Sequence, residues 1–261
     1  MKRQDKWFLP SNVSHKEVLL PESGDTFHET EVKLSSKLSH PNISKLLGYC
    51  SEDMNLFLVY EFIYKGSLET YILNKGFEET LSWSMRVKIM LGTAKGIAYL
   101  HSSENQIIFR DLKTSNILLD QVIGTYGYAA PEYVATGVLV VSGYLNGKND
   151  IYAFGVVLLE TLTGLRVFDN NRPDNKQDLV QWMKPMLSQK KKLMTIVDPS
   201  LGNDYPPEAI CRWAKLILKC TQTEPKDRPC IEQVLQRLER ISCIKTKLFH
   251  ERGRDASVHI L

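Results

Sequence analysis

Three polar side chains in one short run could do chemistry together. The run IIFRDLKTSNILLD, residues 107–120, holds a carboxylate at Asp111, an ammonium group at Lys113 and a side-chain amide at Asn116. A carboxylate can accept a proton from a hydroxyl, an ammonium group can neutralise developing negative charge, and an amide oxygen can bind a divalent cation. An isolated Asp and Asn five positions apart would more often be an ordinary turn, so the rest of the chain decides the interpretation.

The elements that must position this run can be predicted from the apolar pattern. Trp83–His101 has apolar residues at steps of three and four, which predicts a helix packed on one face. Asp150–Thr163 is apolar nearly all round and predicts a helix buried in a large core. Ile117–Leu119 predicts a short buried strand. Further strands are predicted at Val13–Leu20 and Leu56–Tyr60, and further helices at Glu29–Leu38, Leu68–Leu73, Leu179–Leu187, Pro207–Cys220 and Ile231–Ile241.

The overall composition restricts the classes of partner. The 261 residues allow one large domain or two lobes, and the net charge of +3 comes without a clustered basic stripe, so we expect no nucleic-acid partner. Five cysteines lie scattered without C-x-x-C spacing, which argues against a zinc site or a disulfide framework and for a reducing compartment. No segment approaches the ~18 apolar residues that a membrane-spanning helix needs, so we expect no direct membrane insertion.

Four further motifs follow in a fixed order around the polar run. The tetrapeptide Tyr60–Ile63 follows an apolar strand, and Ala130–Glu132 reads APE. Asp150 opens the predicted buried helix, and Arg228 lies in a D-R-P sequence before the last predicted helix. Together with the run at 107–120, this order resembles the motif order of protein kinases.

The residues of several segments resemble one group of protein kinases in particular. Over about residues 13–241 the chain is similar to plant receptor-like cytoplasmic kinases and receptor-like kinases. The segments that carry the similarity are HPNISKLLGYC, LVYEFIYKGSLE, AKGIAYLH, FRDLKTSNILLD, GTYGYAAPEYVATG and DIYAFGVVLLETLTG.

The resemblance implies an α+β fold of two lobes, with a reduced N-lobe and a mainly helical C-lobe. Under this interpretation residues 1–12 are irregular, 13–63 form a partial N-lobe and hinge, 64–241 form the C-lobe, and 242–261 form a loose tail. The catalytic loop would be 107–120, followed by a deletion near 121–123 and an insertion near 138–149.

The resemblance also implies roles for the polar run. Asp111 would orient and deprotonate the attacking hydroxyl, Lys113 would neutralise charge on the transferred phosphoryl group, and Asn116 would hold magnesium. Lys113 and Thr125 favour serine and threonine over tyrosine as substrates.

The same resemblance implies ATP and Mg²⁺ as cofactors and assigns residues to the nucleotide. Lys16 is the candidate for the strand lysine that contacts the ATP phosphates, with Glu31 as its helix partner. Glu61 and Ile63 would belong to the hinge that holds adenine through backbone groups.

Four residues have structural roles in this interpretation. Glu132 and Arg228 would form an ion pair, and Asp150 would anchor the backbone of the catalytic loop. Arg110 would ordinarily receive a phosphate from the activation loop and is otherwise unpaired or structural.

Two departures from the kinase pattern predict impaired activity and doubtful nucleotide binding, and an apparent insertion accompanies them. A G-x-G-x-x-G phosphate loop does not occur before Lys16. Only Gln121–Ile123 separates Asp120 from Gly124, so the metal-binding D-F-G is absent. The eight residue steps from Asn116 to Gly124 span at most ~28 Å of extended chain, which leaves no residue for a loop after the strand. The segment VLVVSGYLNGKN, residues 138–149, is about twice as long as the corresponding connection in the family. Altered exon choice, a decayed paralogue or a faulty gene model would each produce this combination.

Three hypotheses follow. The chain could be a serine/threonine protein kinase in plant signalling, acting on a protein substrate or with a receptor-kinase partner. It could be a pseudokinase, a scaffold or competitor that binds kinase partners without catalysis. It could also fail to fold stably, because the deletion would expose apolar core around Ile117–Leu119. The resemblance further implies a cytoplasmic location, at the inner face of the plasma membrane through partners.

Overall fold

The computed structural model describes residues 13–19, 35–52, 55–63, 65–73, 80–119, 140–141, 147–202, 204–244 and 258–260. The strands are β1 (Val13–Leu19), β2 (Leu46–Glu52), β3 (Asn55–Glu61), β4 (Ile107–Ile108), β5 (Ile117–Leu119), β6 (Val140–Val141) and β7 (Val258–Ile260). The α-helices are α2 (Leu68–Leu73), α3 (Trp83–His101), α4 (Lys148–Thr163), α5 (Leu179–Leu187), α6 (Lys190–Leu193), α7 (Pro207–Cys220) and α8 (Ile231–Ser242). Short 3₁₀ turns include η1 (Thr114–Asn116) and η3 (Pro199–Leu201).

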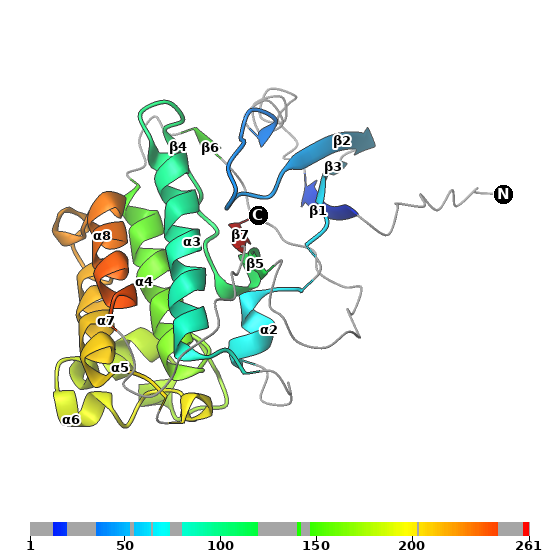
Figure 1. Ribbon diagram of the computed structural model, residues 1–261. Helices are drawn as coiled ribbons and strands as arrows, with labels where there is room; N and C mark the ends of the chain where they lie inside the picture. The colour runs from blue at the N-terminus through cyan, green and yellow to red at the C-terminus, as the bar shows by residue number, and fades with distance from the viewer. Residues whose placement is uncertain are drawn as a thin grey trace.

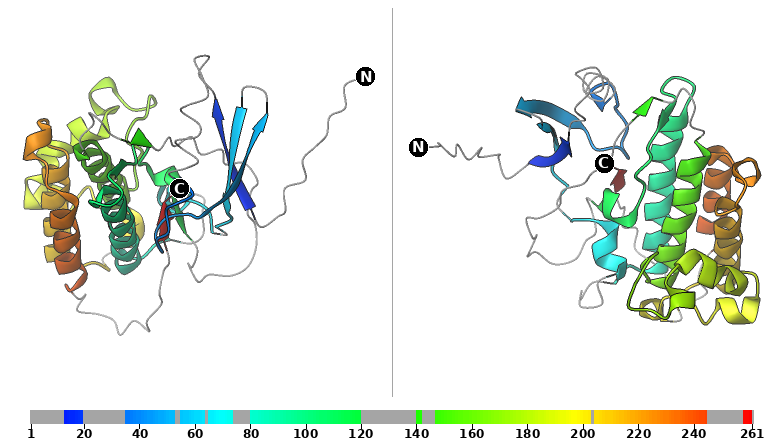
Figure 2. Two further views of the ribbon diagram at one scale, coloured as in Figure 1. Left: turned by 90° about the horizontal axis from the view of Figure 1, so that it is seen from above. Right: turned by 180° about the vertical axis from the view of Figure 1, so that it is seen from behind.

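These elements form a small sheet beside a larger helical body. Figure 1 shows the strands β1, β2 and β3 on one side and the helices α3, α4, α7 and α8 on the other, with β5 and β7 between them. The two further views in Figure 2 keep the same arrangement. This agrees with the predicted α+β architecture of a strand-containing part and a mainly helical part.

The sheet has the order β1-β3-β2, and both pairings are antiparallel. Lys16 of β1 lies opposite Leu58 of β3, and the register of β2 shifts between Leu46 and Gly48. One face of β3 is buried at Leu58 and Tyr60, which follows from the alternation of a strand with one covered face.

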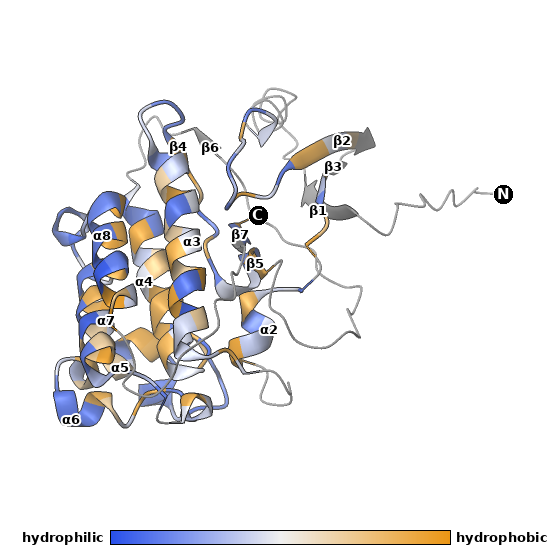
Figure 3. Cartoon of the chain, in the orientation of Figure 1, coloured by the Kyte–Doolittle hydropathy of each residue, from blue (hydrophilic) through white to orange (hydrophobic). Residues whose placement is uncertain are grey.

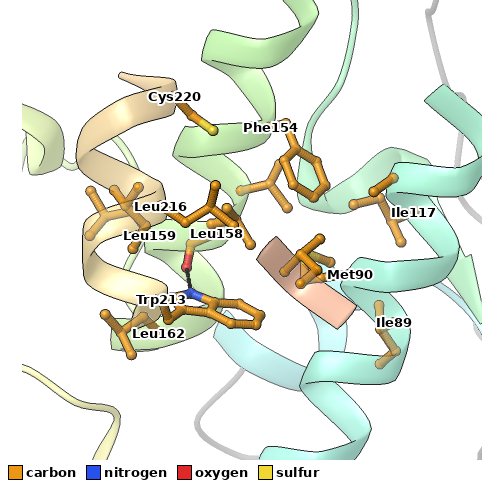
Figure 4. Close-up of a cluster of buried hydrophobic side chains, with 14 of the residues drawn as sticks. Ile89, Met90, Ile117, Phe154, Leu158, Leu159, Leu162, Trp213, Leu216 and Cys220 are labelled. Atoms are coloured by element: carbon orange, nitrogen blue, oxygen red, sulfur yellow. Dashed lines mark hydrogen bonds between the residues drawn. The ribbon is translucent and has the colours of Figure 1, made fainter. Parts of the chain in front are cut away.

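The helical body holds the main core. Trp213 of α7 is fully buried, and its indole Nε1 donates to the carbonyl oxygen of Leu158 in α4 at 3.0 Å (Figure 4). Figure 3 shows α4 hydrophobic along much of its length and α6 hydrophilic, as a central helix and an outer helix should be. Ser82 caps α3 by accepting from the Met85 amide at 3.3 Å, and Gly164 ends α4 in the left-handed region at φ 65°.

A buried ion pair joins α3 to the turn before η3. Nη2 of Arg86 lies 2.6 Å from Oδ2 of Asp198, and Nη1 donates to the carbonyl oxygen of Thr161 at 2.7 Å. Burial lowers the pKa of Arg86, and the nearby Asp198 carboxylate opposes that effect. The charge is therefore held inside the body by a carboxylate and by backbone carbonyls.

The predicted element bounds agree with the structure for α2, α3, β5, α5 and α7. Helix α4 begins at Lys148, two residues before the predicted start, and α8 ends one residue later than predicted. The strands β2, β4, β6 and β7 were not predicted. The predicted helix Glu29–Leu38 lies outside the described residues except at its end.

Two of the unpredicted strands fall in segments expected to be irregular. The structure differs from the expected loose tail 242–261 at Val258–Ile260, which pairs antiparallel with β5. Val140–Val141, inside the predicted insertion 138–149, pairs antiparallel with β4. Both pairings join segments far apart in the chain, so local periodicity could not predict them.

Candidate functional site

The candidate catalytic loop lies between β4 and β5, so strands fix both of its ends. Arg110 is exposed and has a φ of 66°, an uncommon conformation for a residue other than glycine. The amide of Asp111 donates to the carbonyl oxygen of Phe109 at 2.9 Å across this residue. Such strained backbone is often found at functional sites.

The other two polar residues of the loop, Lys113 and Asn116, both contact the Asp111 carboxylate. Nδ2 of Asn116 donates to Oδ2 of Asp111 at 3.0 Å and to its carbonyl oxygen at 2.7 Å. Nζ of Lys113 lies 3.0 Å from the same Oδ2. Asn116 is buried in η1, whereas the side chains of Asp111 and Lys113 remain 28% and 45% exposed. The carboxylate is thus held firmly but stays accessible to a substrate.

Asp150 of α4 fixes the backbone of this loop from inside the helical body. Its Oδ1 accepts from the Arg110 amide and its Oδ2 from the Phe109 amide, both at 2.8 Å. Nε2 of His101 lies 2.7 Å from the same Oδ2. Asp150 is fully buried, so its carboxylate has no water to replace these bonds. The anchor holds the left-handed turn in place.

A second anchor was not predicted from the sequence. Oε2 of Glu160 accepts from the Thr114 hydroxyl at 3.2 Å, and its Oε1 accepts from the Val167 amide at 2.8 Å. Burial raises the pKa of Glu160, while these two hydrogen bonds oppose the rise. The available signal was a carboxylate inside the apolar run VVLLETLT, because a buried charge there requires partners.

Arg228 binds backbone groups at the start of α4 and just after the end of α7. Its Nη1 donates to the carbonyl oxygen of Lys148 at 3.0 Å and its Nε to that of Gln222 at 2.8 Å. Its guanidinium lies 4.8 Å from the ring centroid of Tyr152. The predicted partner Glu132 lies outside the described residues, so that ion pair stays a prediction.

The predicted nucleotide residues are only partly described. Glu61 ends β3, where its Oε1 accepts from the Lys45 amide at 2.9 Å, and Ile63 is buried just after it. The backbone of Lys16 lies in β1. Glu31 and Thr125 lie outside the described residues. The structure therefore brings Asp111, Lys113, Asn116, Arg110 and Asp150 together, and leaves the lysine–glutamate pair and Thr125 as predictions.

The residues available for magnesium are few. Within the described ranges, no group of three or more His, Cys, Asp or Glu side chains could hold a metal ion. Asp111 and Asn116 supply one carboxylate and one amide, and both already bond to each other. A kinase holds its magnesium with a second carboxylate besides the catalytic-loop amide. The described donor set therefore does not fit the ion in that manner.

None of the helices in the described part of the chain is long and apolar enough to cross a membrane.

Comparison with protein families gives a single result. The family model with the description "Protein kinase domain" matches this chain at residues 11–122 and 119–238. The two matched segments meet at 119–122, at the position where the sequence lacks a D-F-G motif.

Curated relatives are plant proteins. The probable serine/threonine-protein kinase PBL10 of Arabidopsis thaliana is 43% identical over 241 residues, which covers 82% of this chain and 57% of PBL10. The serine/threonine-protein kinase BIK1 of Arabidopsis thaliana is 43% identical over 239 residues, covering 81% of this chain and 59% of BIK1. Receptor-like cytoplasmic kinase 176 of Oryza sativa subsp. japonica is 43% identical over 238 residues, which covers 81% of this chain and 59% of the rice protein. The chain thus spans less than two thirds of the length of these relatives.

Proposed function

This chain belongs to the protein kinase domain family, and from that premise we propose that its chemistry is phosphoryl transfer from ATP to serine or threonine hydroxyls of a protein. One observation carries the proposal. The accessible carboxylate of Asp111 is held by Lys113 and Asn116 on a loop that Asp150 fixes from the core. Positioning and charge neutralisation are the main demands of this reaction.

Each side chain of the loop has a role that its surroundings support. Asp111 accepts the proton of the substrate hydroxyl, since its side chain, 28% exposed, is the one carboxylate that the described part of the loop, residues 107–119, presents to solvent. Lys113, 3.0 Å away and nearly half exposed, balances the charge of the phosphoryl group. Asn116 holds the Asp111 carboxylate through its amide, and it would be a metal ligand only beside a second carboxylate, which the described residues do not supply. Asp150 positions the loop without touching substrate.

We further propose that transfer by this chain is impaired. The described residues lack a second metal-binding carboxylate, and the sequence lacks both the D-F-G and the Gly-rich loop. These observations favour a second candidate function, in which the chain acts as a pseudokinase that binds kinase partners as a scaffold or competitor. Its intact helical body supports this role equally well.

The partners and the location are proposals by analogy. The partner would be a protein substrate or a receptor kinase, in plant signalling. The location would be the cytoplasm, at the inner face of the plasma membrane through partners. The printed name of the rice relative, a receptor-like cytoplasmic kinase, supports this choice.

Two measurements on the purified chain separate the candidates. The first is the melting temperature with and without magnesium-ATP at 100 times its dissociation constant, where binding should add ~2.7 kcal/mol and raise the melting temperature by about 5–11 °C. The second is phosphate transfer to a generic protein substrate. An Asp111→Asn variant serves as the catalytic control, and Asp204→Asn, an exposed carboxylate far along the chain, serves as the matched one.

The outcomes are distinct. Transfer that Asp111→Asn abolishes and Asp204→Asn retains supports the enzyme. A magnesium-dependent rise in melting temperature without transfer supports a nucleotide-binding pseudokinase. The third outcome is a cooperative melting transition that does not shift with magnesium-ATP, together with no phosphate transfer. That result rejects the kinase activity and leaves the scaffold.

A further inference from the structure

The strand that follows the candidate catalytic loop, β5, takes its second partner from a distant part of the chain. On one edge the amide of Leu119 donates to the carbonyl oxygen of Gly66 at 2.9 Å. On the other edge β5 pairs antiparallel with β7, with Ile117 opposite Ile260 and Leu119 opposite Val258. The sequence leaves only residues 121–123 after Asp120 before the next motif, too few for a return strand. The edge of β5 is nevertheless covered.

The backbone of β7 is bonded on both sides. The amide of Ile260 donates to the carbonyl oxygen of Asn42 at 3.0 Å, and the amide of Ser44 donates to that of Ile260 at 2.9 Å. Residues 42–44 therefore form the far wall of a groove whose near wall is β5. Only an extended segment can satisfy both walls together.

The floor of this groove is shaped for an aliphatic side chain. Ile260 is fully buried and lies against α3 at Gly96. A Cβ at Gly96 would lie 2.8 Å from the carbonyl oxygen of Asn42 and 3.0 Å from Cδ1 of Ile260, so the close approach requires a glycine. The buried surroundings of Ile260 are completed by Leu38, Ile43, Leu100 and Phe109.

The other side of β7 faces the candidate hinge. Nδ1 of His259 lies 3.8 Å from Oε1 of Glu61, the oxygen that also accepts from the Lys45 amide. The side chain of His259 is only 15% exposed. Figure 1 and Figure 2 show β7 between the sheet and the helical body, beside β5. The segment thus joins the two parts of the molecule.

We propose that the groove between β5 and residues 42–44, floored by α3 at Gly96, is a strand-binding site, and that residues 258–260 of this chain are its ligand. The ligand class is an extended peptide with a buried aliphatic residue at the position of Ile260. The bound segment takes the place of the return strand for which the sequence has no room. It covers the apolar residues of β5 that the deletion would otherwise expose. This goes beyond the proposed function, because it requires neither nucleotide nor phosphoryl transfer.

The first test replaces the buried side chain in the full chain. Ile260→Asp should lower the melting temperature by about 5–15 °C, since removing a buried aliphatic side chain alone costs roughly 2–5 kcal/mol. Ile260→Val keeps the aliphatic contact and should lower the melting temperature by at most a third of the fall expected for Ile260→Asp. Phe168→Asp, at a side chain 57% exposed, is the matched control for an added charge and should leave it nearly unchanged. An Ile260→Asp chain that melts with the wild type overturns the proposal.

Two further measurements test the proposal, and the first of them, on the wild-type chain, remains available if Ile260→Asp does not fold. In the wild-type chain the amides of Ile260 and Ser44 should exchange with deuterium at least 100-fold more slowly than in a free peptide. Where the variant folds, a synthetic ASVHIL peptide (residues 256–261) should raise its melting temperature, whereas ASVHDL should not. Exchange of both amides at free-peptide rates rejects the site, whatever the kinase assays give.

Discussion

Asp150→Asn tests the anchor beneath the candidate catalytic loop. The substitution keeps the size of the side chain and replaces one acceptor oxygen with an NH₂ donor. In the structure the two oxygens of Asp150 receive the amides of Phe109 and Arg110 at 2.8 Å, with His101 at 2.7 Å on one of them. An amide oxygen can serve only one of these positions, so at least one backbone donor loses its acceptor and faces another donor.

The cost can be estimated from these contacts. A hydrogen bond to a charged group contributes about 1.5–3 kcal/mol, and a buried donor left without a partner costs about 1–3 kcal/mol. Because these bonds also hold Arg110 in its left-handed conformation, we expect a loss of about 2–4 kcal/mol in the free energy of unfolding. That loss corresponds to a fall of about 4–16 °C in melting temperature.

Urea unfolding would measure the loss, and hydrogen exchange would locate it. The amides of Phe109 and Arg110 should lose protection in Asp150→Asn more than the amides of α7, which lies away from the loop. Asp204→Asn, at an exposed carboxylate, controls for the change in charge. A loss below about 1 kcal/mol with both amides still protected would refute the anchoring argument.

Three other predictions concern the helical body. Asp198→Ala should cost about 3–5 kcal/mol because it leaves the guanidinium of Arg86 buried without its carboxylate, and the double variant with Arg86→Met should lose less than the sum of the single variants in urea unfolding. Burial raises the pKa of Cys220 from 9.0 to about 12, so the stability linked to its neutral thiol is complete below pH 9 and falls by about 1.4 kcal/mol per pH unit between 9 and 12. Unfolding curves of Cys220→Ala should therefore decline less steeply across that range, and an equal decline would contradict the assignment. Gly155→Ala should lower the free energy of unfolding by about 1–3 kcal/mol, measured by thermal melting, because its Cβ would come 2.7 Å from Cβ of Cys220. A variant as stable as the wild type would show that α4 and α7 can move apart at this contact without loss of stability.

Local signals in the sequence suffice to predict most of the helices and the polar residues of the loop. The helices α3 and α7 agree with their predicted bounds because periodic apolar residues are local signals, as are the Ser82 cap of α3 and the proline at the start of α7. The residues Asp111, Lys113 and Asn116 were found because their spacing within one short loop is also local. The structure adds the distances that bring all three to one carboxylate.

Contacts that join distant parts of the chain depend on packing that no local pattern predicts. The hydrogen bond from Thr114 to Glu160 depends on the packing of α4 under the loop. A carboxylate in an apolar run indicates that a partner is needed, but the sequence does not indicate which residue that partner is. The pairing of β7 with β5 is the clearest case. Three residues, Val258–Ile260, are too few to show a period, and their position is fixed by the uncovered edge of Ile117–Leu119 and by the space above Gly96. A strand can be recognised from its own residues only when it is long enough to alternate, whereas its partner is selected by the backbone groups and apolar surface that remain uncovered.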